Sequence, residues 1–282
     1  MKIYNTIMEL RQGVAEVRLQ NQWIAFVPTM GALHEGHLSL VKAAQEKADK
    51  VIVSIFVNPM QFGPNEDFDR YPRTWEEDCK KLDSCGVEGV FAPEVNEMYP
   101  NGFASTVSVS RLSDGLCGAK RPGHFDGVAT IVTKLFMQGL PDYAFFGEKD
   151  YQQLCIIRQM AKDLNIPVEV FGVPIKRDDF GLALSSRNKY LSEKELDIAR
   201  ELNKILFSMS GEISIAPGNV AEILEQGQIN ILDAGFHCLD YLELRAEETL
   251  EPLQELTQPA RLLTAAYLGK TRLLDNVRVL PQ

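Results

Sequence analysis

The feature that most constrains the fold of this chain is an apolar, strand-like run that passes through a glycine-containing turn into a helix. Residues 23–27 form the strand-like run and residues 38–48 the helix-like one, and Pro-Thr-Met-Gly-Ala-Leu-His-Glu-Gly-His joins them at residues 28–37. Strands that alternate with helices of this length need crossover connections, and crossovers produce parallel pairing. The turn therefore predicts a parallel sheet with helices packed against it.

The alternation continues along the first part of the chain. Further strand-like segments lie at residues 51–57, 87–92, 143–146 and 168–173, and helix-like segments at residues 36–47, 74–85, 127–137 and 151–164. We expect Thr74 to cap its helix, because Glu77 lies three residues further on. Ligands of parallel sheets bind at the carboxyl ends of strands, here residues 28–30, 58–61 and 147–150.

The pattern changes after about residue 176. Helix-like segments at residues 192–208 and 219–234 are followed by strand-like segments at residues 239–245, 261–268 and 275–279. Helices followed by consecutive strands favour a small α+β domain with antiparallel pairing. We therefore expect an α/β protein with a parallel-sheet domain over residues 1–175 and a smaller domain over residues 176–282.

Charge and apolar content narrow the class of protein. The net charge is −10, whereas a broad nucleic-acid surface needs a basic stripe, so we expect no nucleic-acid partner. The apolar run at residues 51–53 is far too short to span a bilayer, and the N-terminus begins no signal-peptide core. The five cysteines include no C-x-x-C pair. We expect a cytoplasmic protein with no membrane partner and no metal held by its side chains.

Two of the four histidines, His34 and His37, lie three residues apart at the start of the first helix-like run. Free N–H groups and the helix dipole attract phosphate there, and imidazoles donate to phosphoryl oxygens without the repulsion of carboxylates. Gly31 and Gly36 allow the backbone to approach a ligand closely. A metal site is one alternative, but the order His-Glu-Gly-His lacks the usual His-Glu-x-x-His spacing. A chance pair is the other, and the flanking strand and glycines favour phosphate.

Polar side chains at other strand ends and loops add to this site. Gln61 follows the strand at residues 51–57, and its amide could orient a hydroxyl or carboxylate. Lys149 could meet a phosphate, and Asp150 either caps the next helix or orients a nucleotide. The triplet Ser185-Ser186-Arg187 suits triphosphate oxygens. Each segment is also compatible with a solvated surface turn.

Two further segments have simpler interpretations. Arg-Pro-Gly-His-Phe at residues 121–125 adds a cation and an imidazole, with a structural loop as the alternative. Gly-Lys-Thr at residues 269–271 resembles the end of a phosphate-binding loop, but Thr264 stands where the first glycine is required. Because strand-like segments flank it, we expect a hairpin turn.

Taken in order, these motifs identify a family. The most specific pieces are TMGALHEGH, SIFVNPMQF, YPRT, RPGHF, FFGEKDYQQL and SSRN, and similarity extends nearly end to end, to the run TRLLDN. The chain closely resembles the pantothenate synthetase (pantoate–β-alanine ligase) family. The resemblance implies a homodimer with a Rossmann-like N-terminal domain and a smaller C-terminal lid domain. It also implies that ATP activates (R)-pantoate as a pantoyl adenylate, which β-alanine then converts to (R)-pantothenate and AMP.

The resemblance also implies roles for individual residues. His37 would be the proton donor, acting with His34, Lys149 and Arg187, while Gln61 and Gln153 would bind pantoate, and Gln61 also β-alanine. A Mg²⁺ ion is expected on the phosphates. The residues expected to hold ATP are Met30, Gly31, Ala32, Leu33, His34, Glu35, Gly36, His37, Gly147, Glu148, Lys149, Asp150, Lys176, Leu184, Ser185, Ser186 and Arg187.

Two residues depart from the family pattern, and three rival functions are open. Lys176 stands where we expect backbone and apolar contact with adenine, and Cys117 where an acidic residue is common. The rivals are another HxGH-type nucleotidyltransferase that activates a different small carboxylate, a fragment of a class I aminoacyl-tRNA synthetase, and an inactive nucleotide-binding scaffold. The acidic balance disfavours the second, and the converging His34, His37, Lys149 and Arg187 disfavour the third.

Overall fold

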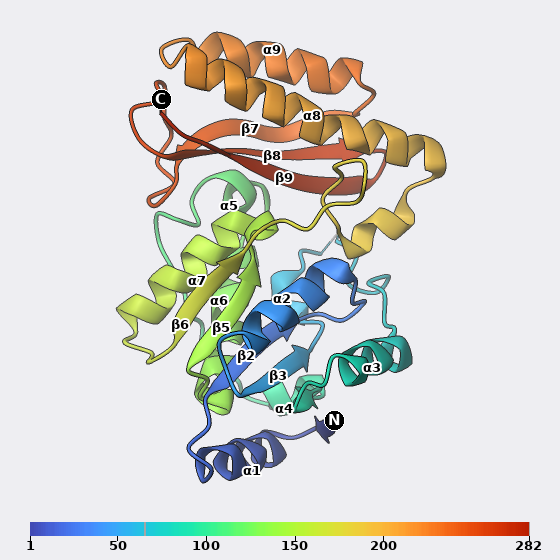
Figure 1. The fold of residues 1–282 in the computed structure, drawn as a ribbon, viewed down its shortest axis with the longest axis vertical. Coiled ribbons are helices and arrows are strands. Elements are labelled where there is room, and N and C mark those ends of the chain that lie inside the picture. The colour runs from blue at the N-terminus through green and yellow to red at the C-terminus, as the bar shows by residue number, and fades with distance from the viewer. Residues whose placement is uncertain (65, 282) are drawn as a thin grey trace.

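The structure, a computed structural model, describes residues 1–64 and 66–281 and contains a parallel and an antiparallel β-sheet (Figure 1). The parallel sheet has six strands in the order β1-β4-β3-β2-β5-β6. The strands are β1 (Lys2–Tyr4), β2 (Ile24–Thr29), β3 (Lys50–Ile55), β4 (Gly89–Phe91), β5 (Tyr143–Gly147) and β6 (Glu169–Val173). The chain proceeds from β2 to β3 and β4 on one side and from β5 to β6 on the other. The order therefore reverses between β2 and β5, where open parallel sheets bind ligands.

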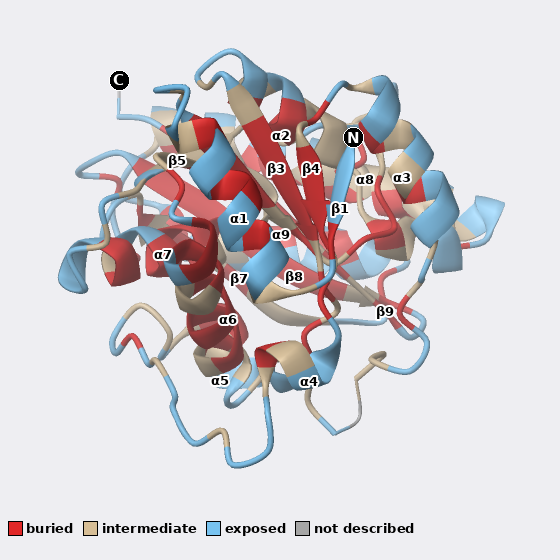
Figure 2. Ribbon diagram, turned by 90° about the horizontal axis from the view of Figure 1, so that it is seen from below, coloured by how far each residue is buried: buried red, intermediate tan, exposed pale blue. Residues whose placement is uncertain are grey.

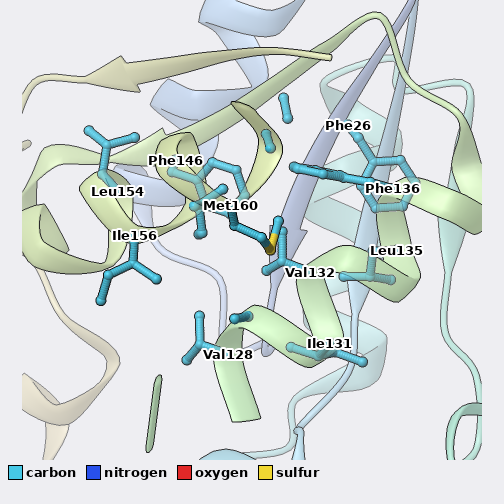
Figure 3. Packing of buried hydrophobic residues seen from close by; sticks show 14 of the residues in the cluster. Phe26, Val128, Ile131, Val132, Leu135, Phe136, Phe146, Leu154, Ile156 and Met160 are labelled. Atoms are coloured by element: carbon cyan, nitrogen blue, oxygen red, sulfur yellow. The ribbon is translucent and has the colours of Figure 1, made fainter. Parts of the chain in front are cut away.

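Helices cover both faces of the parallel sheet. One face packs against α1 (Ile7–Arg18), α6 (His124–Gly139) and α7 (Tyr151–Asp163), and the other against α2 (Glu35–Gln45) and α3 (Trp75–Ser84). Figure 3 shows Phe26 of β2 among the apolar side chains of α6 and α7. The neighbouring Ala25 and Val27 belong to the core on the opposite face. A strand buried on both faces needs a continuous apolar run, which explains the pattern at residues 23–27.

The antiparallel sheet belongs to a smaller C-terminal unit. It comprises β7 (Cys238–Ala246), β8 (Ala260–Leu268) and β9 (Thr271–Val279). Helices α8 (Glu193–Ile215) and α9 (Val220–Asp233) cover its outer face, as Figure 1 shows. Its inner face contributes Leu263, Leu274 and Tyr241 to the core of the first unit. The predicted α/β class, with a parallel sheet followed by an α+β unit, is confirmed.

The predicted elements all appear, with shifted bounds. Strand β9 begins at Thr271 instead of residue 275, and α8 extends to Ile215 instead of residue 208. The hairpin expected at residues 269–271 is confirmed, because β8 and β9 pair on either side of Gly269 and Lys270. Elements not predicted from the sequence are β1 and α1, together with the short helices α4 (Val95–Met98) and α5 (Leu116–Lys120) and the 3₁₀ helices at Pro59–Gln61, Glu148–Asp150 and Ser186–Tyr190. Figure 2 shows β3, β4 and α6 largely buried and β1 more exposed. Because β1 lies at the edge of the sheet, it does not need the continuous apolar pattern by which the inner strands were predicted.

The predicted cap of α3 is wrong in its detail. Thr74 does stand at the N-cap, but its side chain accepts no hydrogen bond from the helix backbone. Its hydroxyl instead donates to the buried carboxylate of Asp78, 3.1 Å away. The backbone of Thr74, at φ −121° and ψ 47°, is not in the extended conformation that N-cap residues usually adopt, so its hydroxyl oxygen does not meet the helix N–H groups. No helix among residues 1–64 and 66–281 combines the length and apolarity that a membrane crossing requires.

Candidate active site

A cavity of about 680 Å³ lies at the carboxyl ends of the parallel strands and reaches the C-terminal sheet. It is lined by the β2–α2 turn, the loop after β3, the β5–α7 turn, the loop around residues 184–187 and the β8–β9 hairpin. The strand order reverses beside it, between β2 and β5. Segments far apart in sequence thus converge where the fold favours a ligand.

Most residues assigned to the site from the motifs line this cavity. They are Met30, His34, Gly36, His37, Gln61, Gly147, Lys149, Asp150, Gln153, Lys176, Leu184, Ser185, Ser186 and Arg187. Gly31, Ala32, Leu33, Glu35 and Glu148 do not line it. Ala32 and Leu33 are buried beneath the turn, and Glu35 is exposed to solvent.

The two histidines cap their own helix. His34 is the N-cap of α2, and its Nδ1 accepts a hydrogen bond from the Gly36 N–H at 3.1 Å. The Nδ1 of His37 accepts from the His34 N–H at 3.3 Å, and the ring centroids are 4.1 Å apart. Because both Nδ1 atoms accept, a neutral ring carries its proton on Nε2. Each histidine can therefore donate through Nε2 to an anion in the cavity.

The surroundings keep both rings neutral. Burial, together with the nearby charges of Lys149 and then Lys81, lowers the pKa of His34 to about 4. Burial, His34 and Lys149, in that order, lower the pKa of His37 to about 3. At neutral pH the pair therefore supplies hydrogen-bond donors without positive charge.

Helix α3 holds the backbone of the β2–α2 turn. Gly31 and Ala32 both have positive φ angles, 80° and 51°, so the turn adopts a conformation that needs support at the alanine. The carboxylate of Asp78, which is 1% exposed, accepts the N–H groups of Ala32 and Leu33, each at 2.8 Å. Lys81 donates to the Leu33 carbonyl at 2.7 Å. Ala32 and Leu33, which do not line the cavity, are thus the points at which the turn is anchored.

Gln61 is held from both sides. Its Oε1 accepts from Asn58 at 3.1 Å, and Asn58 is itself buried and donates to the Gly127 carbonyl. The Gln61 carbonyl accepts from Nδ1 of His124 at 2.7 Å. Because Arg121 can only donate to Nε2 of His124, the proton of this imidazole lies on Nδ1. The Arg-Pro-Gly-His-Phe loop therefore supports the site and also lines it.

The β5–α7 turn divides its side chains between the cavity and the C-terminal unit. Lys149 Nζ lies 3.4 Å from the Asp150 carboxylate, and both residues line the cavity. Asp150 occupies the N-cap position of α7 but makes no capping hydrogen bond with its side chain. The carboxylate of Glu148 points the other way, to Arg261 of β8 at 2.8 Å. Asn276 of β9 donates to the main-chain carbonyls of Glu148 and Lys149.

The two glutamines that open α7 have different surroundings. Gln153 lines the cavity. Gln152 is 4% exposed, and its amide binds the start of α5 and the loop before it. It accepts from the Cys117 N–H and donates to the Leu112 and Gly115 carbonyls. Only Gln153 is therefore placed to meet a ligand in the cavity.

The Ser-Ser-Arg loop is linked to the loop after β3. Arg187 makes a bidentate ion pair with Asp67, with N–O distances of 3.0 and 2.8 Å. Ser185 caps the following turn by accepting from the Arg187 N–H, and the Ser186 hydroxyl lies 3.2 Å from the Tyr71 hydroxyl. Asp67 and Tyr71 were not predicted from the sequence, because neither stands in a strand-end turn.

The cavity also contains cations whose charge the protein does not neutralise. Lys176 and Lys270 line it, and neither is in an ion pair within the described ranges 1–64 and 66–281. The Lys176 carbonyl accepts from the Leu184 N–H at 2.9 Å, so part of its backbone is already used. Uncompensated positive charge in a concave site favours a polyanionic ligand.

Comparison with known proteins identifies the family. Residues 2–278 match the family model described as pantoate-beta-alanine ligase. A pantothenate synthetase from Paramagnetospirillum magneticum is 53% identical over 279 residues, covering 99% of this chain and 98% of the relative. The crystal structure of pantothenate synthetase from Thermus thermophilus is 46% identical and superposes with a TM-score of 0.93, covering 100% of both chains.

A further crystal structure bears on the ligands. It is a pantoate-beta-alanine ligase from Francisella tularensis complexed with beta-gamma ATP and beta-alanine. It is 37% identical to this chain, has a TM-score of 0.83, and the alignment covers 98% of this chain and 97% of that one. The family resemblance expected from the motifs is confirmed over the whole chain. This chain belongs to the pantoate-beta-alanine ligase family.

Proposed function

We propose that the cavity catalyses the two steps by which ATP drives the joining of (R)-pantoate to β-alanine. In the first step a pantoate carboxylate oxygen attacks the α-phosphorus of ATP, and the bond to diphosphate breaks to leave a pantoyl adenylate. In the second step the amine of β-alanine attacks the acyl carbon, loses a proton and expels AMP. The observation that carries the proposal is the convergence of His34, His37, Lys149 and Arg187 on one cavity in a chain of this family.

The neutral histidines suit the first step. Negative charge grows on the phosphoryl oxygens as the carboxylate attacks, and donors fixed in advance in a sheltered site stabilise that charge. His34 and His37 present Nε2–H groups because their Nδ1 atoms are occupied by the helix backbone. We assign His37 as the hydrogen-bond donor nearest the reacting phosphate, with Lys149 and Arg187 as the cations that bind the phosphates.

We assign pantoate to the two amides in the cavity. Gln61 and Gln153 line it, and Gln61 is fixed by Asn58 and by the loop that carries His124. A neutral amide holds a hydroxyl or carboxylate without the strong ion pair that would weaken the carboxylate as a nucleophile. We also assign β-alanine to Gln61, as the family resemblance implies.

The residues present fit a Mg²⁺ ion carried by ATP. Mg²⁺ at such sites takes most of its ligands from phosphates and water and only one or two from protein carboxylates. In the described part of the chain no group of three or more potential metal-binding side chains occurs. Asp150 places a carboxylate in the cavity beside Lys149, which satisfies that requirement. Bound there, the ion would neutralise charge on the phosphates.

Isotope exchange between diphosphate and ATP tests the function. The expected result is exchange that depends on pantoate and does not need β-alanine. Exchange with a different hydroxy acid, but not with pantoate, would favour another HxGH-type nucleotidyltransferase. No exchange with any acid would exclude the adenylate mechanism.

We further propose that residues 1–175 form the substrate-binding domain and residues 176–282 a lid, in a cytoplasmic homodimer. An adenylate hydrolyses readily, so a lid that excludes water would protect it. Solution scattering should show a more compact particle with ATP and pantoate than without them. Identical scattering curves would exclude the lid.

A further inference from the structure

The side-chain amide of Asn276 is a buried polar group that links the two units. Asn276 is 2% exposed and lies on β9, beside Leu263 of β8 on the face that meets the first unit. Its Nδ2 donates to the Glu148 carbonyl at 2.9 Å and to the Lys149 carbonyl at 3.1 Å. Both acceptors belong to the β5–α7 turn, whose Lys149 faces the cavity.

The chemistry of its partners fixes the orientation of this amide. Its Oδ1 lies 2.9 Å from Nη1 of Arg261, and a guanidinium can only donate. The two main-chain carbonyls can only accept, so they require the NH₂ group. Flipping the amide would place oxygen against two carbonyls and NH₂ against a cation. The residue is therefore suited to this one arrangement.

The surrounding network holds the amide in place. Arg261 is 7% exposed, pairs with the Glu148 carboxylate and stacks over the Tyr151 ring with its guanidinium carbon 4.1 Å from the ring centroid. On the other side, the adjacent Asp275 forms a bidentate pair with Arg177, at 2.6 and 2.7 Å. Arg177 lies in the connection between the two units, so β9 holds both the turn and that connection.

The two carbonyls define the direction of the lysine. The Glu148 carbonyl belongs to the peptide plane before Lys149, and the Lys149 carbonyl to the plane after it. Because each peptide is planar, holding both oxygens fixes the backbone on either side of the Lys149 Cα and hence the direction in which its Cα–Cβ bond starts the side chain. A small change in this direction is costly at a reacting centre.

We propose that Asn276 is a positioning residue for Lys149, through which the C-terminal unit sets the geometry of the ATP site. This inference rests on the proposed role of Lys149 in binding ATP. The C-terminal unit then does more than cover the bound substrates, because its strand β9 holds the β5–α7 turn that carries Lys149.

The test is a double-mutant cycle on the Kd of Mg-ATP, measured by calorimetry on the full-length chain with Asn276→Asp and Lys149→Ala. Asn276→Asp keeps the shape of the side chain and the oxygen that accepts from Arg261. It places its second oxygen against the main-chain carbonyls of Glu148 and Lys149. It should weaken ATP binding about 10-fold in the wild-type background, because it misdirects Lys149. In the Lys149→Ala background it should cause no further loss, since the two changes remove the same interaction.

The matched control is Arg278→Gln. Arg278 also lies on β9, but its side chain pairs with Glu247 and does not touch the turn. It should leave the Kd of Mg-ATP unchanged. If thermal melting shows that Asn276→Asp does not fold, Asn276→Ser replaces it in the cycle, because a hydroxyl retains one donor in a smaller volume.

The outcomes separate the inference from the proposed function. If the double mutant lost ATP affinity by the product of the two single-mutant factors, the inference would be overturned. Asn276 would then act on the fold and not through Lys149. Unchanged affinity in Asn276→Asp, with weakened affinity in Lys149→Ala, would also overturn the inference alone. Unchanged affinity in Lys149→Ala would instead overturn the proposed role of Lys149.

Discussion

The two turns that bring phosphate-binding groups to the cavity are held in different ways. The β2–α2 turn is anchored within its own unit, by Asp78 and Lys81 of α3 and by the capping bonds of its own histidines. The β5–α7 turn is held from the C-terminal unit, by Asn276. The first half of the site is thus fixed before any domain movement, whereas the second follows the position of β9.

The largest effect on activity should come from His37→Ala, which removes a hydrogen-bond donor from the β2–α2 turn. Diphosphate exchange should fall at least about 100-fold, because a fixed donor to a developing phosphoryl charge is lost. The ring also caps α2, so His37→Asn serves as the control for helix stability. A near-normal exchange rate in His37→Ala would mean that the ring only shapes the turn.

Asp78→Asn should break the anchor of the same turn without touching the cavity. An amide at this position cannot accept the N–H groups of Ala32 and Leu33 with both of its heavy atoms, so one donor is left unpaired. We expect the free energy of unfolding to fall by about 2 kcal/mol, measured by urea denaturation. Exchange should fall about 10-fold, because the histidines move with the turn.

The matched control for this change is Asp83→Asn. Asp83 lies on the same helix, but it is exposed and contacts the N-terminal amine. Neither stability nor exchange should change measurably in Asp83→Asn. Equal behaviour of the two variants would show that the contacts of α3 with the turn are dispensable.

Acid should destabilise the half of the site that the β2–α2 turn forms. The pKa values of His34 and His37 fall to about 4 and 3 on folding, so as the pH drops below about 6.5 the unfolded chain binds protons first. Stability that is fully present above pH 6.5 is therefore lost as the pH falls towards 4, by up to about 1.4 kcal/mol per pH unit for each ring. Urea midpoints between pH 7.5 and 4.5 should fall less steeply in His37→Asn than in wild type. Parallel curves would contradict the lowered pKa of His37.

The smallest effect should come from Glu148→Gln, in the half held from the second unit. The carboxylate points to Arg261, and the carbonyl bonds to Asn276 do not depend on it. Arg261 keeps its second ion pair with Glu247, and Glu148 does not line the cavity, so the Kd of Mg-ATP should change less than about 3-fold. A loss of 10-fold or more would favour the nucleotide contact that the family motif predicts for this residue.

The contrast between the turns also explains what the sequence could predict. The fold class and most cavity residues were predictable because parallel sheets collect polar side chains at strand ends, and those residues stand beside clear strand patterns. Asp78 was not, because it is one of three adjacent acidic residues on α3 and only packing decides which is buried. Asn276 lies inside a strand, 127 residues from Lys149, so no local pattern relates them.

The hydrogen bonds from β9 to the backbone of the β5–α7 turn have a consequence for protein engineering. Because the acceptors are main-chain carbonyls, the turn could change its side chains and keep these bonds, provided that its backbone path is preserved. Arg261 and Glu148, by contrast, are matched side chains. A chimera assembled from two parent enzymes should therefore inherit residues 143–151 and 260–279 from the same parent. A crossover placed between these segments would combine Lys149 from one parent with β9 from the other. The lysine could then be misplaced even if each half folded normally.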